Sequence, residues 1–162
     1  MISFGEIKIV PTIDEHIPSF WEILREWPNI PYEDYWKFCD WFQDTALESL
    51  TALDNGQVVG CGYLDQVYPG YYATIAVFKK RGYLNPKMVA AVCKEGLPYF
   101  FERNDLEKLI ALVEVGQKAS LKLVKRLGFR KVGVVCHHTK VNGKWADFVW
   151  YEILREQVNK RS

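Results

Sequence analysis

The sequence has no long hydrophobic run and no excess of charge of one sign. Its first residues also lack the basic region followed by an apolar stretch that is typical of a leader. No apolar stretch approaches the roughly 18 residues that a membrane-spanning helix needs. Residues 1–6 do not have the pattern of a secretory signal peptide. The formal net charge of +1 gives no general attraction to nucleic acid. We therefore expect a soluble, cytoplasmic protein that does not bind membranes; its overall charge does not favour nucleic acid, although a local basic patch stays open.

Closely spaced cysteines are also missing. The four cysteines, Cys39, Cys61, Cys93 and Cys136, are far apart and form no C-x-x-C pair, so neither a zinc site nor any other metal site is expected. A chain of 162 residues, 49 % hydrophobic and 25 % charged, can bury a core without disulfides or metals. No repeat or Pro/Gly/Ser-rich linker divides it, so we expect one domain over residues 1–162.

The hydrophobic periodicity predicts seven strands and about four helices. Strands are expected at 6–10, 49–53, 58–68, 71–78, 109–115, 129–138 and 147–154. Helices are expected at 17–27, from Pro31 to 42, 86–101 with a kink at Pro98, and 118–126. Asn55-Gly56 and Asn142-Gly143 are typical of hairpin turns. The order β-α-α-β-β-β-α-β-α-β-β predicts a layered α+β fold with a mixed sheet.

Two motifs in the last third carry a resemblance. Residues 111–120 read A-L-V-E-V-G-Q-K-A-S, and Arg126-Leu127-Gly128-Phe129 follow; residues 142–147 read N-G-K-W-A-D. These stretches resemble GNAT acyl-CoA N-acyltransferases, in particular the ribosomal-protein (Rim-type) branch, with Gln117 in place of the branch's asparagine. The resemblance implies the GNAT fold, in which a mixed central sheet of six or seven strands is splayed in the middle.

The resemblance also implies a binding site for acetyl-CoA, the co-substrate, in the V between the splayed strands. The pantetheine arm would pair with unpaired backbone groups of strand 71–78, here those of Ala76, Val77 and Phe78. Gln117 and Ser120 would lie on the far side of the co-substrate.

The pyrophosphate loop departs from the family's R/Q-x-x-G-x-G/A pattern. When Arg81 is taken as its first residue, the two glycine positions hold Leu84 and Pro86. The cations Lys79, Lys80 and Arg81, with Gly82 in the turn, could neutralise the pyrophosphate instead. The alternative is a solvated basic turn.

Acetyl transfer to an amine needs a base, a donor for the oxyanion and an acid for the departing thiolate. The tyrosine that many family members use as the acid falls at Val124, so Ser120 is the candidate for hydrogen bonding to the thiolate. Glu114 is the candidate base. Tyr72, as a phenol facing the acceptor groove, is a third catalytic candidate, and its neighbour Tyr71 and one of His137 and His138 are alternatives.

Aromatic residues of the first two helices are expected near the acceptor groove, namely Trp21, Trp27, Tyr32, Tyr35 and Trp36. The first functional hypothesis is an N-acetyltransferase that acts on a primary amine: a protein N-terminus, a lysine or a small amine. The second is a GNAT-like protein that binds a partner or a CoA ester without turnover. A third and weaker hypothesis is nucleic-acid binding through residues 79–81. A homodimer formed by exchange of the last strand is compatible with the fold.

Overall fold

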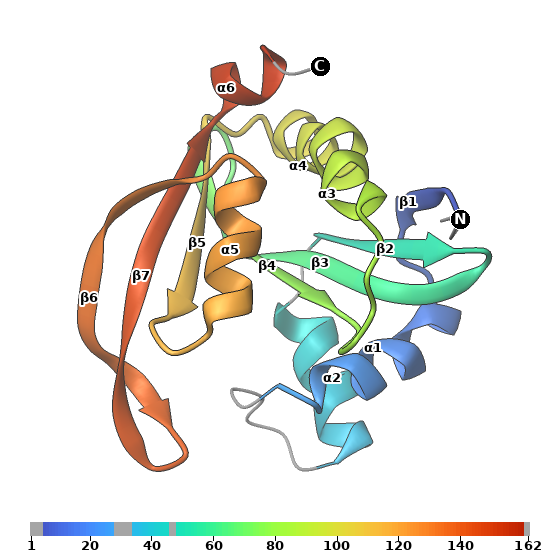
Figure 1. Ribbon diagram of the computed structural model, residues 1–162, viewed down its shortest axis with the longest axis horizontal. Coiled ribbons are helices and arrows are strands. Elements are labelled where there is room, and N and C mark those ends of the chain that lie inside the picture. The colour runs from blue at the N-terminus through green and yellow to red at the C-terminus, as the bar shows by residue number, and fades with distance from the viewer. Residues whose placement is uncertain (1–4, 28–33, 46–47, 161–162) are drawn as a thin grey trace.

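The protein is a seven-stranded mixed sheet with helices on both faces (Figure 1). The computed structural model describes residues 5–27, 34–45 and 48–160. The strands lie in the order β1-β2-β3-β4-β5-β7-β6, and all neighbours are antiparallel except β4 and β5. Their bounds are β1 Ile7–Pro11, β2 Glu48–Asp54, β3 Gln57–Tyr68, β4 Tyr72–Lys79, β5 Lys108–Glu114, β6 Arg130–Val141 and β7 Lys144–Leu154.

Four helices of eight or more residues are present in the described ranges, together with shorter ones. The bounds are η1 Asp14–His16, α1 Ile17–Leu24, α2 Tyr35–Thr45, α3 Lys87–Ala91, the π-helical turn η2 Val92–Gly96, α4 Leu97–Asn104, α5 Lys118–Arg126 and α6 Arg155–Asn159. No helix among the described residues is both long and apolar enough to cross a bilayer.

This architecture confirms the expected layered α+β fold and its splayed mixed sheet, with differences at element ends. The helix expected at 86–101 consists of α3, η2 and α4, which follow one another without a break, and Pro98 is the second residue of α4, directly after the π-helical turn. The last two strands are longer than expected because Asn142 and Gly143 make a two-residue turn, both with positive φ. The start expected at Pro31 lies outside the described residues, and α6 was not expected.

Each face of the sheet has its own apolar core. On one face, Leu97 and Phe100 of α4 and Val124 of α5 pack against strands β3, β4, β5 and β7. On the other face, Phe20 and Leu24 of α1 join α2 and the β3 side chains that point the opposite way. Because side chains alternate along a strand, β4 contributes residues to both cores, which places it at the centre of the molecule.

The two parallel strands separate soon after they meet. β4 pairs with β5 only through Tyr72–Lys108, Ala73–Leu109 and Thr74–Ile110. Beyond these pairs β4 stays paired with β3 as far as Lys79, and β5 stays paired with β7 as far as Glu114. Figure 1 shows their ends pointing apart. One edge of each strand is therefore left unpaired, as the resemblance implies.

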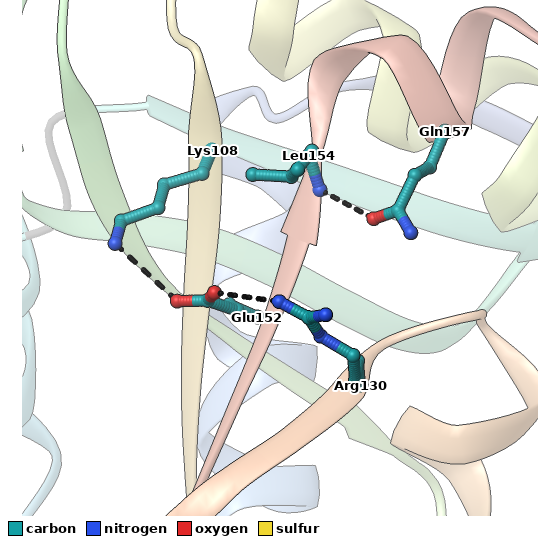
Figure 2. Close-up of polar contacts among 5 residues, drawn as sticks. All are labelled: Lys108, Arg130, Glu152, Leu154 and Gln157. Atoms are coloured by element: carbon teal, nitrogen blue, oxygen red, sulfur yellow. Dashed lines mark hydrogen bonds and ion pairs between the residues drawn. The ribbon is translucent and has the colours of Figure 1, made fainter.

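A charged cluster holds the closed end of this V (Figure 2). The Glu152 carboxylate on β7 lies 3.3 Å from Lys108 Nζ on β5 and 3.5 Å from Arg130 Nη2 on β6. Lys108 Nζ also lies 5.8 Å from the centre of the Tyr72 ring on β4. The cluster thus joins side chains of four adjacent strands where β4 and β5 are still paired. β7 is paired with β5 and β6 of its own chain, and strand exchange between two chains stays a prediction.

Glu152→Ala is expected to lower the free energy of unfolding by about 1 kcal/mol, because Lys108 and Arg130 both lose their carboxylate partner. Urea denaturation measures this loss, and 1 M NaCl should shrink it because salt screens the charges. Glu22→Ala, which breaks the solvent-exposed pair with Arg25, is the control and should have little effect. A denaturation midpoint equal to that of the wild type would show that the cluster is not stabilising.

Candidate active site

A cleft opens where β4 and β5 separate. Its volume is about 130 Å³, and it is open to solvent on one side. Its walls come from β4, β5, α5 and the residues that flank α5, with one residue each from β7 and the turn after α1. The lining residues are Trp27, Ile75, Ala76, Val77, Phe78, Ala111, Leu112, Val113, Glu114, Gln117, Ser120, Leu123, Val124, Leu127, Phe129 and Phe148.

Three polar side chains line this otherwise apolar cleft. Among the described lining residues, only Glu114, Gln117 and Ser120 carry a carboxylate, an amide or a hydroxyl group. Glu114 ends β5, Gln117 immediately precedes α5, and Ser120 lies in the first turn of α5. The sheet edge and the helix start therefore bring together three residues that the sequence analysis had selected.

The turn between β5 and α5 fixes this group. Gln117 Nε2 donates a hydrogen bond to Glu114 Oε2 at 3.2 Å, and Gln117 N donates to Glu114 O at 3.0 Å. A Cβ on Gly116 would lie 3.1 Å from Glu114 Oε1, so glycine lets the carboxylate fold back over the turn. The positive end of the α5 dipole lies beside the same group and favours negative charge there.

The opposite wall is the free edge of β4, where Ala76, Val77 and Phe78 line the cleft. Alternate residues of an edge strand direct their N–H and C=O groups outward. The Trp27 ring lies against Phe78, with ring centres 6.2 Å apart, and the Arg81 guanidinium carbon lies 5.6 Å from the Trp27 ring centre. Trp27, in the turn after α1, thus closes one side of the cleft and contacts Arg81, which follows β4.

The loop from 79 to 86 is fastened by its own side chains. Lys79 Nζ donates to Tyr83 O at 2.8 Å, and the Tyr83 hydroxyl donates to Asp54. Burial and this bond raise the pKa of Tyr83 to about 12, so it stays a neutral donor. Gly82 has φ +75°, which glycine accepts without strain. Lys79 therefore braces the loop, while Lys80 and Arg81 are exposed.

Asn85 occupies the start of the following helix. Its side-chain oxygen accepts a hydrogen bond from Lys87 N at 2.9 Å, and its amide nitrogen donates to Gly5 O at 3.1 Å. Asn85 O accepts from Met88 N at 3.0 Å. Two backbone N–H groups that a helix start could present to a phosphate thus already donate hydrogen bonds to Asn85. The sequence analysis noted the altered glycine pattern but missed this cap, although asparagine before a helix is its usual signal.

The remaining candidates lie in different places. Val124, at the position of the family's tyrosine, lines the cleft. Tyr72 lies at the closed end of the V, against Lys108 and with its ring centre 5.0 Å from that of Tyr68. It is not among the lining residues, so the structure does not bring it to Glu114 and Ser120.

Of the two histidines, His138 lies beside a cleft residue, since its ring centre is 5.0 Å from that of Phe148. His137 stacks on Trp145 instead. Phe148 itself was missed in the sequence analysis, because strand alternation does not show which side of β7 faces a ligand. Of the expected aromatic residues, Trp27 lines the cleft, whereas Tyr32 lies outside the described residues.

The fold and cleft are those of an acyltransferase family, and the sequence comparison agrees. Residues 14–129, most of the chain, match the family described as Acetyltransferase (GNAT) family. The chain therefore belongs to the GNAT acetyltransferase family.

Individual relatives are more distant. The Bacillus subtilis protein YdaF, provisionally named a ribosomal N-acetyltransferase, is 28 % identical over 94 residues, which are 58 % of this chain and half of YdaF. A spermidine N-acetyltransferase from Vibrio cholerae, solved with CoA and spermine, has a TM-score of 0.79 and 16 % identity over 95 % of this chain and 98 % of its own. A ribosomal-protein-alanine N-acetyltransferase from Brucella melitensis has a TM-score of 0.74 and 19 % identity, covering 91 % and 99 %. At these identities the two structures show the shared fold.

Cys61, paired with Phe78 next to the cleft wall, should be chemically inert. Burial raises the pKa of its thiol to about 12, so only about one molecule in 10⁴ holds the thiolate at pH 8. Iodoacetamide at pH 8 should modify the exposed Cys136 in the folded protein and leave Cys61 unmodified, as read by peptide mass spectrometry. The same reaction in urea is the control and should label both. Modification of Cys61 at a rate close to that of Cys136 would contradict this prediction.

Proposed function

We propose that the protein transfers the acetyl group of acetyl-CoA to a primary amine. The observation that carries this proposal is the group formed by Glu114, Gln117 and Ser120 at the gap between two unpaired strand edges. The gap offers a backbone edge for an extended arm, and the group offers the acid–base chemistry for the end of that arm. Membership of the GNAT family supports the reaction class.

The pantetheine arm would lie along Ala76–Phe78 as an additional strand. Its amide groups would pair with the N–H and C=O groups of β4 that are no longer paired with β5. The remaining walls are apolar side chains of β5 and α5, which exclude water from the thioester. Directed from the loop toward the point where the strands meet, this arm would carry its thioester into the cleft.

The proposed reaction forms one C–N bond and breaks one C–S bond. The Glu114 carboxylate, directly or through water, takes a proton from the acceptor ammonium, and the free amine attacks the thioester carbonyl. The tetrahedral intermediate collapses and CoA leaves as the thiolate, to which the Ser120 hydroxyl donates a hydrogen bond; the second proton lost by the attacking nitrogen then protonates this sulfur. Gln117 orients Glu114 through their 3.2 Å hydrogen bond. The products are an amide, CoA-SH and a proton.

Pyrophosphate binding would depend on side-chain charge more than on backbone amides. Asn85 already takes the Lys87 N–H, and the Lys79 ammonium is bonded to the Tyr83 carbonyl. Lys80 and Arg81 remain exposed, and Arg81 is held over Trp27 at the cleft wall. These two cations are the proposed partners of the pyrophosphate.

Lys80→Ala with Arg81→Ala is expected to weaken acetyl-CoA binding by about 10- to 100-fold, because two charge-assisted contacts are lost. Isothermal titration calorimetry measures this change. Binding of S-acetylpantetheine, which has no pyrophosphate, should be unaffected by the same substitutions.

The control for this experiment is Lys131→Ala with Lys144→Ala, which removes the same charge from the β6–β7 hairpin. It should leave acetyl-CoA affinity close to that of the wild type. Equal affinity for acetyl-CoA in the wild type and the 80/81 variant would overturn the pyrophosphate assignment.

Glu114→Gln is expected to lower kcat by about 100-fold or more, because the amide cannot accept the ammonium proton. The dissociation constant of acetyl-CoA should change little, since Glu114 is proposed to act on the acceptor. Acetylation of peptide N-termini, lysine peptides and spermidine is followed by CoA release. Glu156→Gln, on α6, is the matched control. Retention of kcat by Glu114→Gln on a substrate that the wild type uses would remove Glu114 from the base role.

Two observations favour a second candidate, a GNAT-like protein that binds a CoA ester without turnover. Val124 lines the cleft where the family's tyrosine would provide an acid, and Asn85 fills the helix start. Tight acetyl-CoA binding by the wild type, without acetylation of any acceptor in the panel, would support this candidate. Acetylation of one acceptor would exclude it.

A further inference from the structure

A second, fully apolar cavity adjoins the cleft on the face of β4 that α3, η2 and α4 cover. Its volume is about 50 Å³, and only apolar surface lines it. Five residues line both the cavity and the cleft: Ile75, Val77, Phe78, Leu123 and Leu127. The two spaces therefore share the β4 side chains and the inner side of α5.

Glycines on both sides of the cavity leave it open. Gly62 of β3 and Gly96 of η2 line it. A Cβ on Gly62 would lie 3.6 Å from Ala76 O and 3.9 Å from Phe100 Cε2, and one on Gly96 would lie 3.7 Å from Val92 Cγ1. These are ordinary contacts, so alanine would fit at both positions. Gly60 differs, because its Cβ would approach Phe78 O to 2.9 Å.

Neither Gly62 nor Gly96 is thus at a position where a close backbone approach requires glycine, and neither has a positive φ. Glycine inside a strand or helix costs stability relative to alanine. The π-helical form of η2 also departs from a regular helix over the cavity, and such turns frequently occur at functional sites. Keeping this cavity open therefore lowers the stability of the fold, as is expected where a protein maintains a binding pocket.

We propose that this cavity receives the last carbons of a short acyl group, so that the protein uses propanoyl-CoA and butanoyl-CoA as well as acetyl-CoA. The inference rests on the proposed function. An arm lying along Ala76–Phe78, with its thioester beside Ser120, would direct its acyl chain toward Ile75, the first β4 residue beyond the β5 pairing. Ile75 lines both spaces, so carbons beyond the acetyl group would pass beside it into the cavity.

The size of the cavity limits the chain length. An engineered apolar cavity of about 150 Å³ holds benzene, and this cavity of about 50 Å³ has room for two or three carbons. Each methylene buried in apolar surroundings strengthens binding by roughly fourfold. Butanoyl-CoA, with two more methylenes than acetyl-CoA, should therefore bind up to about 15-fold more tightly, whereas octanoyl-CoA should bind more weakly than butanoyl-CoA. The transfer is unchanged: the acyl C–S bond breaks, a C–N bond forms, and CoA takes a proton.

The test is calorimetric titration of the wild type with acetyl-, propanoyl-, butanoyl- and octanoyl-CoA, repeated with Gly62→Ala, Gly96→Ala and the double variant. Each added methyl group occupies part of the cavity. The double variant should therefore lower the ratio of butanoyl-CoA to acetyl-CoA affinity by about tenfold and leave acetyl-CoA affinity unchanged. Gly133→Ala is the matched control, because its Cβ would have no atom within 4 Å, and it should keep the wild-type ratio.

The outcomes separate this inference from the proposed function. If acetyl-CoA binds and butanoyl-CoA binds more weakly, or if the double variant keeps the wild-type ratio, the acyl pocket is overturned while the function stands. If no acyl-CoA binds, both the acyl pocket and the proposed function are overturned. A thermal melt checks that each variant is folded; if the double variant is not, the wild-type series and Gly62→Ala decide.

Discussion

The site depends on the early end of one pairing, between parallel strands β4 and β5. Three residue pairs hold them together, and each strand then follows its other neighbour, β3 or β7. Unpaired backbone groups in a protein interior are costly, and the cleft leaves those of this gap accessible to solvent or to a ligand that offers its own amides. The charged cluster around Glu152 lies at the closed end. It joins side chains of the strands at the end where β4 and β5 are still paired.

The chemistry of the opening follows from the same geometry. Because β5 stays paired with β7 as far as Glu114, its end is held firmly beside the gap. The turn through Gly116 then starts α5 at once, so Gln117 bonds to that carboxylate and Ser120, one turn further on, lines the same cleft. Side chains at a strand end and a helix start are held in place more precisely than side chains on a long loop.

Sequence reasoning recovered what local pattern and motif encode. The segment 111–129 predicted the strand, the turn and α5, and it selected three residues that now meet in the cleft. What it could not recover depends on contacts between distant segments. Asn85 with Gly5, and Arg81 with Trp27, are pairs far apart in the chain. Tyr72 was expected at the acceptor groove because it lies in the right strand, yet its place along β4 puts it at the closed end.

The loop after β4 shows how a broken motif can be consistent with a working site. Glycines in such a loop expose backbone amides to phosphate, but they also leave the free loop flexible, and ordering it on binding costs entropy. Here Lys79, Tyr83 and Asn85 fasten the loop before any ligand arrives. The loop therefore has fewer free amide donors. Lys80 and Arg81, however, extend from a loop held in place by hydrogen bonds, and Arg81 already lies over the Trp27 ring. If this loop binds the pyrophosphate as we propose, its affinity comes from charge on a preorganised frame, and it should fall with ionic strength more steeply than affinity that depends on backbone amides.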